Sequence, residues 1–318
     1  MLSLRSILTQ TLLAVAAIAP FAHGQSVGPG VVSGDTFTHD PTIVKKPDGS
    51  YIMAFTADNV GLKTSTDRTA WHDVGPAFPN GAPWTTHYTK GDRNLWAPDI
   101  SYHNGQYYLY YSASSFGSSV SAIFLATSPT GQPGSWTNRG LVIESNGNSN
   151  YNCIDPNLIV DAQGRWWMTF GSFWSGIKIV ALDPNTGMRS DNNLRSIAAR
   201  PANGGELEAP YIHRHGDYYY LWLSFDRCCN GAASTYRTMV GRSRSVTGPF
   251  VDRNGVDMMN GGGTEILRTH GNIYGPGHPA VFTDNDADVL VYHYYQPNGD
   301  AQIGLNLMRY ENGWPVVY

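Results

Sequence analysis

The strongest constraint on the fold is an internal repeat. Five segments follow one template, in which a Pro near the start is followed by alternating apolar residues, a polar turn and an aromatic-rich run. This alternation predicts two antiparallel strands joined by a tight turn. The segments span residues 40–56, 97–114, 155–172, 209–225 and 278–295, and their template prolines, Pro41, Pro98, Pro156, Pro210 and Pro279, are 57, 58, 54 and 69 residues apart.

These intervals leave room for a second, weaker strand pair after several of the repeats. We expect such pairs over residues 63–71, 126–136 and 241–250. Four antiparallel strands repeated five times predict an all-β fold, a five-bladed β-propeller with four-stranded antiparallel blades. A β-sandwich also contains many short strands, but it gives no reason for a repeat of this length.

The N-terminus has the features of a secretory signal. Arg5 precedes an apolar run over residues 12–18, and small residues follow at Ala22 and Gly24. We therefore expect residues 1–24 to be a signal peptide and residues 25–318 to form the propeller of a secreted, extracellular protein. The apolar run is shorter than the roughly 18–20 residues of a membrane span, so no membrane association is predicted, although an uncleaved anchor stays an alternative.

Charge and cysteine content limit the classes of ligand and partner that the chain can bind. Only 14% of the residues are charged, the net charge is −4, and Lys and Arg are scattered, which gives no footprint for nucleic acid. The three cysteines lack the spacing of a zinc site. The sequence leaves open whether one disulfide joins Cys153 to Cys228 or to Cys229. A closed propeller has only short edges to pair, so we expect a monomer.

Ionisable residues recur where each repeat begins. The innermost strand of every blade lines the central channel, so the starts of the five first strands should meet at one mouth. Those starts carry Asp40, Asp155, Glu208 and His278, with Asp99 in the remaining repeat. Crowded carboxylates repel one another, so their convergence favours a chemical role, while a turn-capping role is the structural alternative.

These blocks resemble glycoside hydrolase family 43, over nearly all of the chain after the signal segment. The stretch 225–231, with its adjacent cysteines, is most similar to the fungal endo-1,5-α-L-arabinanases of that family. The resemblance implies a five-bladed propeller, in agreement with the repeat. The blocks that carry it are His39-Asp40-Pro41, Trp96-Ala97-Pro98-Asp99-Ile100, Ile154-Asp155-Pro156-Asn157, Glu208-Ala209-Pro210-Tyr211 and Gly275-Pro276-Gly277-His278-Pro279.

The resemblance implies catalytic roles for three acids. Asp40 would be the general base, Glu208 the general acid, and Asp155 the carboxylate that raises the pKa of Glu208 and orients it. The family inverts configuration, which implies that the base and acid stand about 6.5–9.5 Å apart with water between them. Asp99 is left out, because it follows its proline and one step along a strand reverses the facing.

Further residues are expected to bind a cation and the sugar. In similar arabinanases the residue matching His278 holds a central hydrated cation, often calcium, whose other ligands would be water; no organic cofactor is expected. Furanose rings offer an apolar face and hydroxyl edges, which aromatic and polar side chains match. The candidate substrate-binding residues are His39, Trp96, Phe116, Asn157, Phe173 and Trp174.

The resulting hypothesis is endo-hydrolysis of linear α-1,5-arabinan, a side chain of plant pectin. The alternatives within the fold are an exo-acting arabinanase, an arabinofuranosidase and a xylosidase, which would share the three acids. The alternative from another class is a sugar-binding propeller without catalysis. Loop shape around the channel decides between endo and exo action, and one sequence does not specify it.

Overall fold

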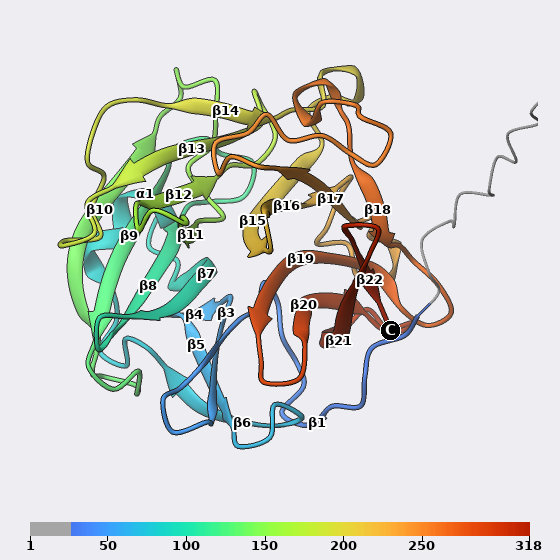
Figure 1. The fold of residues 1–318 in the computed structure, drawn as a ribbon. Helices are drawn as coiled ribbons and strands as arrows, with labels where there is room; N and C mark the ends of the chain where they lie inside the picture. Colours follow the sequence, from blue (N-terminus) through green and yellow to red (C-terminus); the bar gives the residue numbers. More distant parts are fainter. Residues whose placement is uncertain (1–26) are drawn as a thin grey trace, which may run out of the picture.

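The computed structural model describes residues 27–318, which form five sheets arranged around a central axis (Figure 1). The expected signal segment, residues 1–24, lies outside the described residues. The innermost template strands are β2, β7, β11, β15 and β19, one per sheet. The predicted five-bladed β-propeller is therefore confirmed.

Blades one and two have five strands, because β1 pairs in parallel with the outer strand β6 and β4 pairs with the inner side of β7. The remaining blades have four strands each. The strands of blades one and two are β1 Ser33–Gly34, β2 Thr42–Lys45, β3 Tyr51–Phe55, β5 Gly61–Ser65 and β6 Ala70–Pro76, then β4 Ala57–Asp58, β7 Asn94–His103, β8 Gln106–Ala113, β9 Ser121–Ser128 and β10 Thr137–Ser145.

Blades three to five follow in chain order. Within residues 27–318, helical structure is limited to α1 Thr86–Thr89 and four 3-10 turns, Pro83–Thr85, Pro201–Asn203, Gly231–Ala233 and Met258–Asn260. The strands are β11 Asn157–Val160, β12 Trp166–Phe170, β13 Ile177–Leu182 and β14 Arg195–Ala198, then β15 Leu207–His215, β16 Tyr218–Phe225, β17 Arg237–Ser243 and β18 Thr264–Leu267, and finally β19 Tyr274–Thr283, β20 Asp288–Tyr295, β21 Ala301–Glu311 and β22 Trp314–Val317.

The core is divided among the junctions between blades. Each of five buried apolar clusters joins two neighbouring blades, including one between blades five and one. The aromatic runs noted in the sequence supply much of it: Tyr110, Tyr111, Tyr220 and Trp222 are at most 1% exposed. Burial of these large rings between sheets favours closure of the ring of blades.

One predicted strand is placed wrongly. We expected the outer pair of blade four to end near Phe250, whereas β17 pairs with β18, which begins at Thr264. The chain near Phe250 makes only isolated bridges, because Val251 faces Arg242 on one side and Asp257 on the other. The Gly and Pro before Phe250 therefore belong to a loop between β17 and β18, not to a tight turn between two strands of the blade.

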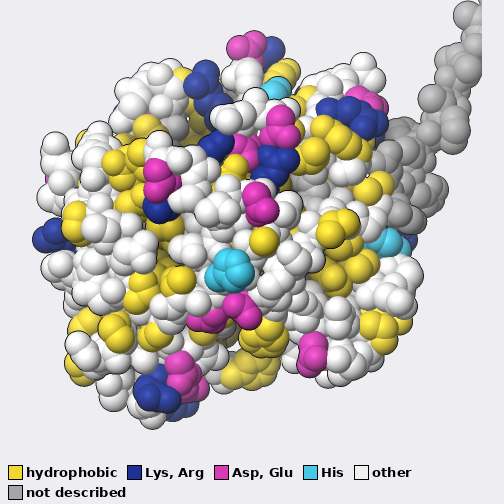
Figure 2. Space-filling model, turned by 90° about the horizontal axis from the view of Figure 1, so that it is seen from below, with side chains coloured by type: hydrophobic (Ala, Val, Ile, Leu, Met, Phe, Trp, Pro, Cys, Tyr) yellow, Lys and Arg dark blue, Asp and Glu magenta, His cyan; other side chains and the backbone are white. Residues whose placement is uncertain are grey.

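Helix length and surface charge over the described residues can be compared with the expectations from the sequence. No helix within residues 27–318 is long and apolar enough to cross a membrane. On the face shown in Figure 2, Lys and Arg side chains lie singly or beside Asp and Glu, among polar and apolar groups. This distribution is consistent with the scattered charge seen in the sequence.

Candidate active site

The site begins with an unusual backbone conformation that all five blades share. The residue before each template proline has a positive φ of 47° to 59°, which is uncommon for any residue except Gly. The ladder between the first two strands is irregular at this point in blades two, four and five, where a bulge occurs. Bulges re-aim side chains. The five residues are Asp40, Ala97, Asp155, Ala209 and His278.

A ring of hydrogen bonds holds these five positions. The backbone N–H of each residue donates to a side chain of the preceding blade, at 2.7–3.1 Å. In four blades the acceptor lies at the end of the second strand, but blade three has Gly171 there, and Asp155 accepts instead. Each blade is therefore hydrogen-bonded to the next at the channel mouth. The acceptors, from blade one to blade five, are Thr56, Ser112, Asp155, Ser224 and His293.

Asp40 is surrounded by donors. One of its carboxylate oxygens, Oδ1, lies 3.0 Å from His278 Nδ1, and the other, Oδ2, lies 2.6 Å from Thr56 Oγ1 and 2.9 Å from His39 Nδ1. Burial alone would raise the pKa of Asp40, but His39 and His278 together hold that pKa well below its usual range. The carboxylate is therefore ionised, as a general base requires.

The surroundings of Glu208 favour the protonated carboxyl group, in contrast to those of Asp40. Burial raises the pKa of Glu208, hydrogen bonds from Ser172 and Tyr236 partly offset that rise, and the negative charge of Asp40 adds to it. Ser172 Oγ lies 2.5 Å from Oε2, and the Tyr236 hydroxyl donates to Oε1. The two carboxyl groups, Asp40 and Glu208, thus favour different protonation states at one pH.

Asp155 lies beside this pair and is itself buried. Its Oδ2 accepts from the N–H of Ala209 at 3.0 Å, so it fixes the backbone directly after Glu208. Burial raises the pKa of Asp155, and Glu208 and Asp40 raise it further against the opposing effect of His278. Burial is the main cause of the raised pKa of Glu208, and the charge of Asp40 adds to it. The repulsion between Asp155 and Glu208 that the sequence predicted raises the pKa of Asp155.

His278 faces Asp40 and leaves one ring nitrogen free. Burial lowers the pKa of His278, but Asp40, Asp155 and Glu208 outweigh it and raise that pKa to about 9. Its Nδ1 faces Asp40, so only Nε2 is available as a metal ligand. Calcium takes six to eight oxygen ligands, so this donor set fits a cation only if water completes the shell and Nε2 is unprotonated.

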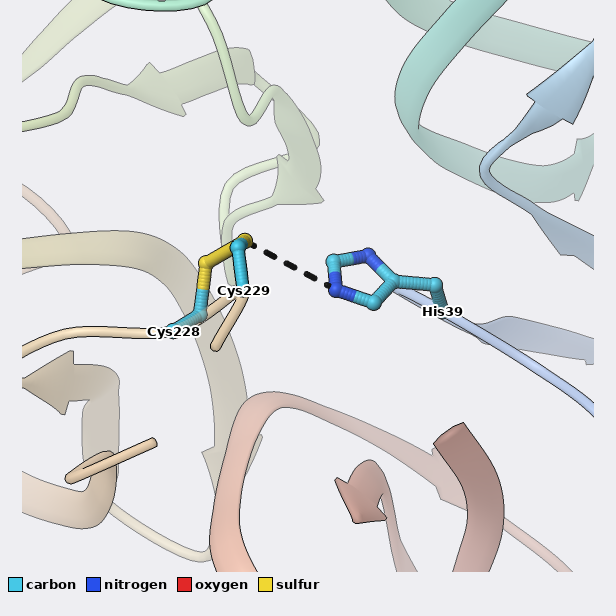
Figure 3. A group of neighbouring side chains, drawn as sticks. All are labelled: His39, Cys228 and Cys229. Atoms are coloured by element: carbon cyan, nitrogen blue, oxygen red, sulfur yellow. Dashed lines mark hydrogen bonds between the residues drawn. A yellow bond between two sulfur atoms is a disulfide. The ribbon is translucent and has the colours of Figure 1, made fainter. Parts of the chain in front are cut away.

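Adjacent cysteines form a disulfide next to His39. Cys228 and Cys229 are bonded to each other, and Cys229 Sγ lies 3.8 Å from His39 Nε2 (Figure 3). The Cys229 N–H donates to the Tyr295 hydroxyl at 3.0 Å, and that hydroxyl lies 2.9 Å from His39 Nε2. The bridge from Cys153 that the sequence left open is not formed, because Cys153 is a buried free thiol. The disulfide instead fixes one side of the channel mouth.

The aromatic candidates lie in different environments. The Phe173 N–H donates to the carbonyl of Leu207 at 2.9 Å, so Phe173 and its neighbour Trp174 run alongside Glu208. Both have positive φ, and 46% of Trp174 is exposed. Trp96 precedes Ala97 and is partly exposed. Phe116 is 88% exposed in the loop between β8 and β9, without a described contact to the acids.

Asn157 was expected to contact the substrate, but its side chain is buried between blades. It is 1% exposed, its Oδ1 accepts from the Ile212 N–H at 2.8 Å, and its amide group faces Asp99. The side chain therefore joins blades two, three and four instead of facing a ligand. Asp99 also accepts from the Leu158 N–H at 2.7 Å, and burial raises the pKa of Asp99 to about 7.

A family comparison identifies the chain. The model of glycosyl hydrolases family 43 matches residues 31–315, nearly the whole of the described chain. The chain belongs to this family. The resemblance read from the sequence motifs is confirmed, and the protein is a glycoside hydrolase, so the alternative of a sugar-binding propeller without catalysis is set aside.

Relatives and solved structures similar to this chain include arabinanases. The extracellular endo-α-(1→5)-L-arabinanase 1 of Bacillus subtilis is 44% identical over 283 residues, which cover 87% of this chain and 86% of that protein. The family 43 endo-arabinanase of Bacillus licheniformis superposes with a TM-score of 0.84 at 43% identity, covering 90% of this chain and 99% of that one. An exo-1,5-α-L-arabinanase from a bovine ruminal metagenomic library has a TM-score of 0.84 at 40% identity, with 89% and 97% covered.

Two residues of this family 43 site, His293 and Tyr236, were not predicted from the sequence. His293 lies near the end of β20, at the position that Thr56, Ser112 and Ser224 occupy in other blades. That shared position was visible in the repeat and could have revealed it. Tyr236 carries no such signal, because it lies in the loop before β17 and reaches Glu208 only through the folded chain.

Proposed function

We propose that this glycoside hydrolase is a secreted endo-acting enzyme that cleaves α-1,5-L-arabinofuranosidic bonds in linear arabinan. The observation that carries the proposal is the contrast between two carboxyl groups at one end of the channel. Asp40 is held ionised by His39 and His278, while burial raises the pKa of Glu208. Hydrolysis of a glycosidic bond needs one carboxyl group in each state.

The proposed reaction is a single displacement. Asp40 accepts a proton from a water molecule as the water oxygen bonds to the anomeric carbon of the arabinosyl residue. Glu208 donates its proton to the departing glycosidic oxygen as the bond from carbon to that oxygen breaks. The reducing end is formed with inverted configuration. Afterwards Asp40 is protonated and Glu208 ionised, and exchange with solvent restores both.

Neighbouring groups would maintain this arrangement. Asp155 holds the backbone beside Glu208 through the Ala209 N–H and so orients the acid. His278 would hold a hydrated cation such as calcium through Nε2, and the positive charge of that ion would favour ionised Asp40. No organic cofactor is required for this chemistry.

Substrate contacts are proposed for residues around the mouth. Phe173 and Trp174 lie along the strand that carries Glu208 and offer rings against which a furanose can pack. Glu208 directly precedes the residue with positive φ in blade four. His39 holds the same position in blade one, and Trp96 holds it in blade two. Phe116 offers an exposed ring on the loop between β8 and β9.

The test is the chain-length distribution of early products from debranched linear arabinan, with a Glu208→Ala variant beside the wild type. A ladder of arabino-oligosaccharides from the wild type alone supports endo cleavage by this site. NMR of the first reducing ends should detect the β-anomer, because the cleaved bond is α. Release of the α-anomer first would contradict single-step inversion.

Exo action is the second candidate, because a solved exo-arabinanase is nearly as similar as the endo enzymes. It predicts monomer or one fixed short oligomer from the first minutes of reaction. Arabinofuranosidase or xylosidase activity would instead appear as faster release from short substrates than from the polymer.

A further inference from the structure

A second cluster of titratable side chains lies away from the acids. Two histidines, His213 and His215, are alternate residues near the end of β15 and so share one face of the strand. Both contact Asp288, the first residue of β20 in the next blade. Glu208 lies at the other end of β15, five residues before His213, which is about 16 Å along a strand. The cluster is therefore separate from the proposed active site.

The spacing of the three side chains fits a metal ion. His213 Nε2 and His215 Nδ1 lie 3.0 Å and 3.1 Å from the same atom, Asp288 Oδ2. All three ligand atoms are within 4.8 Å of one another. Ligands at about 2.0–2.1 Å from a tetrahedral ion stand roughly 3.3 Å apart. The two distances from histidine nitrogen to Asp288 Oδ2 therefore need to change by only tenths of an ångström to admit an ion.

The hydrogen bonding at Asp288 is crowded. Its Oδ2 faces three donors, since the Tyr310 hydroxyl also lies 3.0 Å away, yet a carboxylate oxygen has two lone pairs. A cation in place of the two histidine protons would leave Oδ2 with two partners, the ion and Tyr310. Thr283 Oγ1 donates to Oδ1 at 2.7 Å, so the carboxylate is already held in place.

Exposure and ligand type indicate which ion would bind. Asp288 and His213 are largely buried, with side chains 6% and 11% exposed, whereas the His215 side chain is 48% exposed. An ion here would be reached from solvent past His215 and could keep water as its remaining ligand. Two imidazole nitrogens with one carboxylate oxygen suit Zn²⁺ or Cu²⁺ better than Ca²⁺ or Mg²⁺.

We propose that His213, His215 and Asp288 form a binding site for a transition-metal cation of the Zn²⁺ class, at the end of the inner strands opposite the acids. The bound ion fastens blade four to blade five. This junction has no covalent link among the described residues, since the disulfide joins neighbours in one loop. The ion stabilises the folded chain, because the three ligands meet only in the closed propeller.

The test uses Zn²⁺ as the probe on the full chain after chelator treatment and dialysis. Titration calorimetry should detect one bound equivalent in the wild type, and excess Zn²⁺ should raise the melting temperature by about 3 °C or more. The variant His215→Phe keeps a ring against Tyr310, on which His215 stacks at 3.6 Å, but removes the ligand nitrogen. We expect at least tenfold weaker binding and no rise in melting temperature.

Matched variants locate the ion. His72→Ala, at an exposed histidine elsewhere, should bind Zn²⁺ as the wild type does. His278→Ala should also retain the equivalent, because that residue lies at the other end of the channel. Asp288→Asn provides a second loss of a ligand if His215→Phe does not fold. The proposal is overturned if the wild type binds no Zn²⁺, if His215→Phe binds it unchanged, or if His278→Ala alone loses it.

Discussion

Tyr236→Phe isolates one hydrogen bond on the proposed acid. The Tyr236 hydroxyl is buried and donates to Glu208 Oε1, which favours the ionised carboxylate. A hydrogen bond to a charged group contributes about 1.5–3 kcal/mol, and Ser172 still donates to the other oxygen, so we take the low end. About 1.4 kcal/mol is a tenfold change in the ratio of ionised to protonated Glu208.

The variant should therefore remain active further into the alkaline range. Glu208 must be protonated to act, and removal of the donor raises its pKa, so the alkaline limb of the profile of kcat/KM against pH should move upward by about 1 on the pH scale. The acid limb, set by Asp40, should stay in place. Tyr220→Phe is the control, because its hydroxyl donates to the Gly313 carbonyl, away from the acids. A Tyr236→Phe profile with an unmoved or lowered alkaline limb refutes the reasoning.

Three further outcomes follow from the site. Trp174→Ala should raise KM for arabinan about fivefold from the loss of about 1 kcal/mol of ring contact, and Phe116→Ala should do the same if its exposed ring binds sugar; an unchanged KM removes the residue from the binding surface. Asn157→Ala should lower the free energy of unfolding in urea by about 2 kcal/mol without changing KM, because the Ile212 N–H loses its partner; a raised KM with normal stability argues for the sugar contact instead. Chelation with EDTA should lower wild-type activity and added Ca²⁺ restore it, whereas His278→Ala should not respond; full activity after chelation contradicts the cation at His278.

The features of the fold that recur in every repeat could be predicted from the sequence. Five equivalent prolines define five equivalent backbone positions, and the structure shows the same positive φ before each of them. The ionisable residues found there, Asp40, Asp155 and His278, therefore meet for reasons of symmetry alone. The raised pKa of Glu208 was also predicted in sign, because the reaction needs a protonated acid, whereas the part played by burial and by the histidines beside Asp40 was not.

Departures from the repeat could not be predicted in the same way. Blade three has Gly171 where other blades have a hydroxyl or an imidazole, and Asp155 supplies the missing acceptor, which ties its carboxylate to the backbone. Asn157 was misjudged because it lies close to Asp155 in sequence, although the residue directly after the proline faces the neighbouring blades. Contacts such as that of Tyr236 depend on loop paths, which have no period.

The most direct test of the account compares two variants on two substrates. Glu208→Ala should lose hydrolysis of linear arabinan but keep most activity on an aryl α-1,5-arabinobioside, whose phenolate leaving group needs no protonation. Asp40→Ala should lose activity on both, because water is no longer activated. Equal losses on both substrates for Glu208→Ala, or retained aryl cleavage by Asp40→Ala, would contradict the assignment of acid and base.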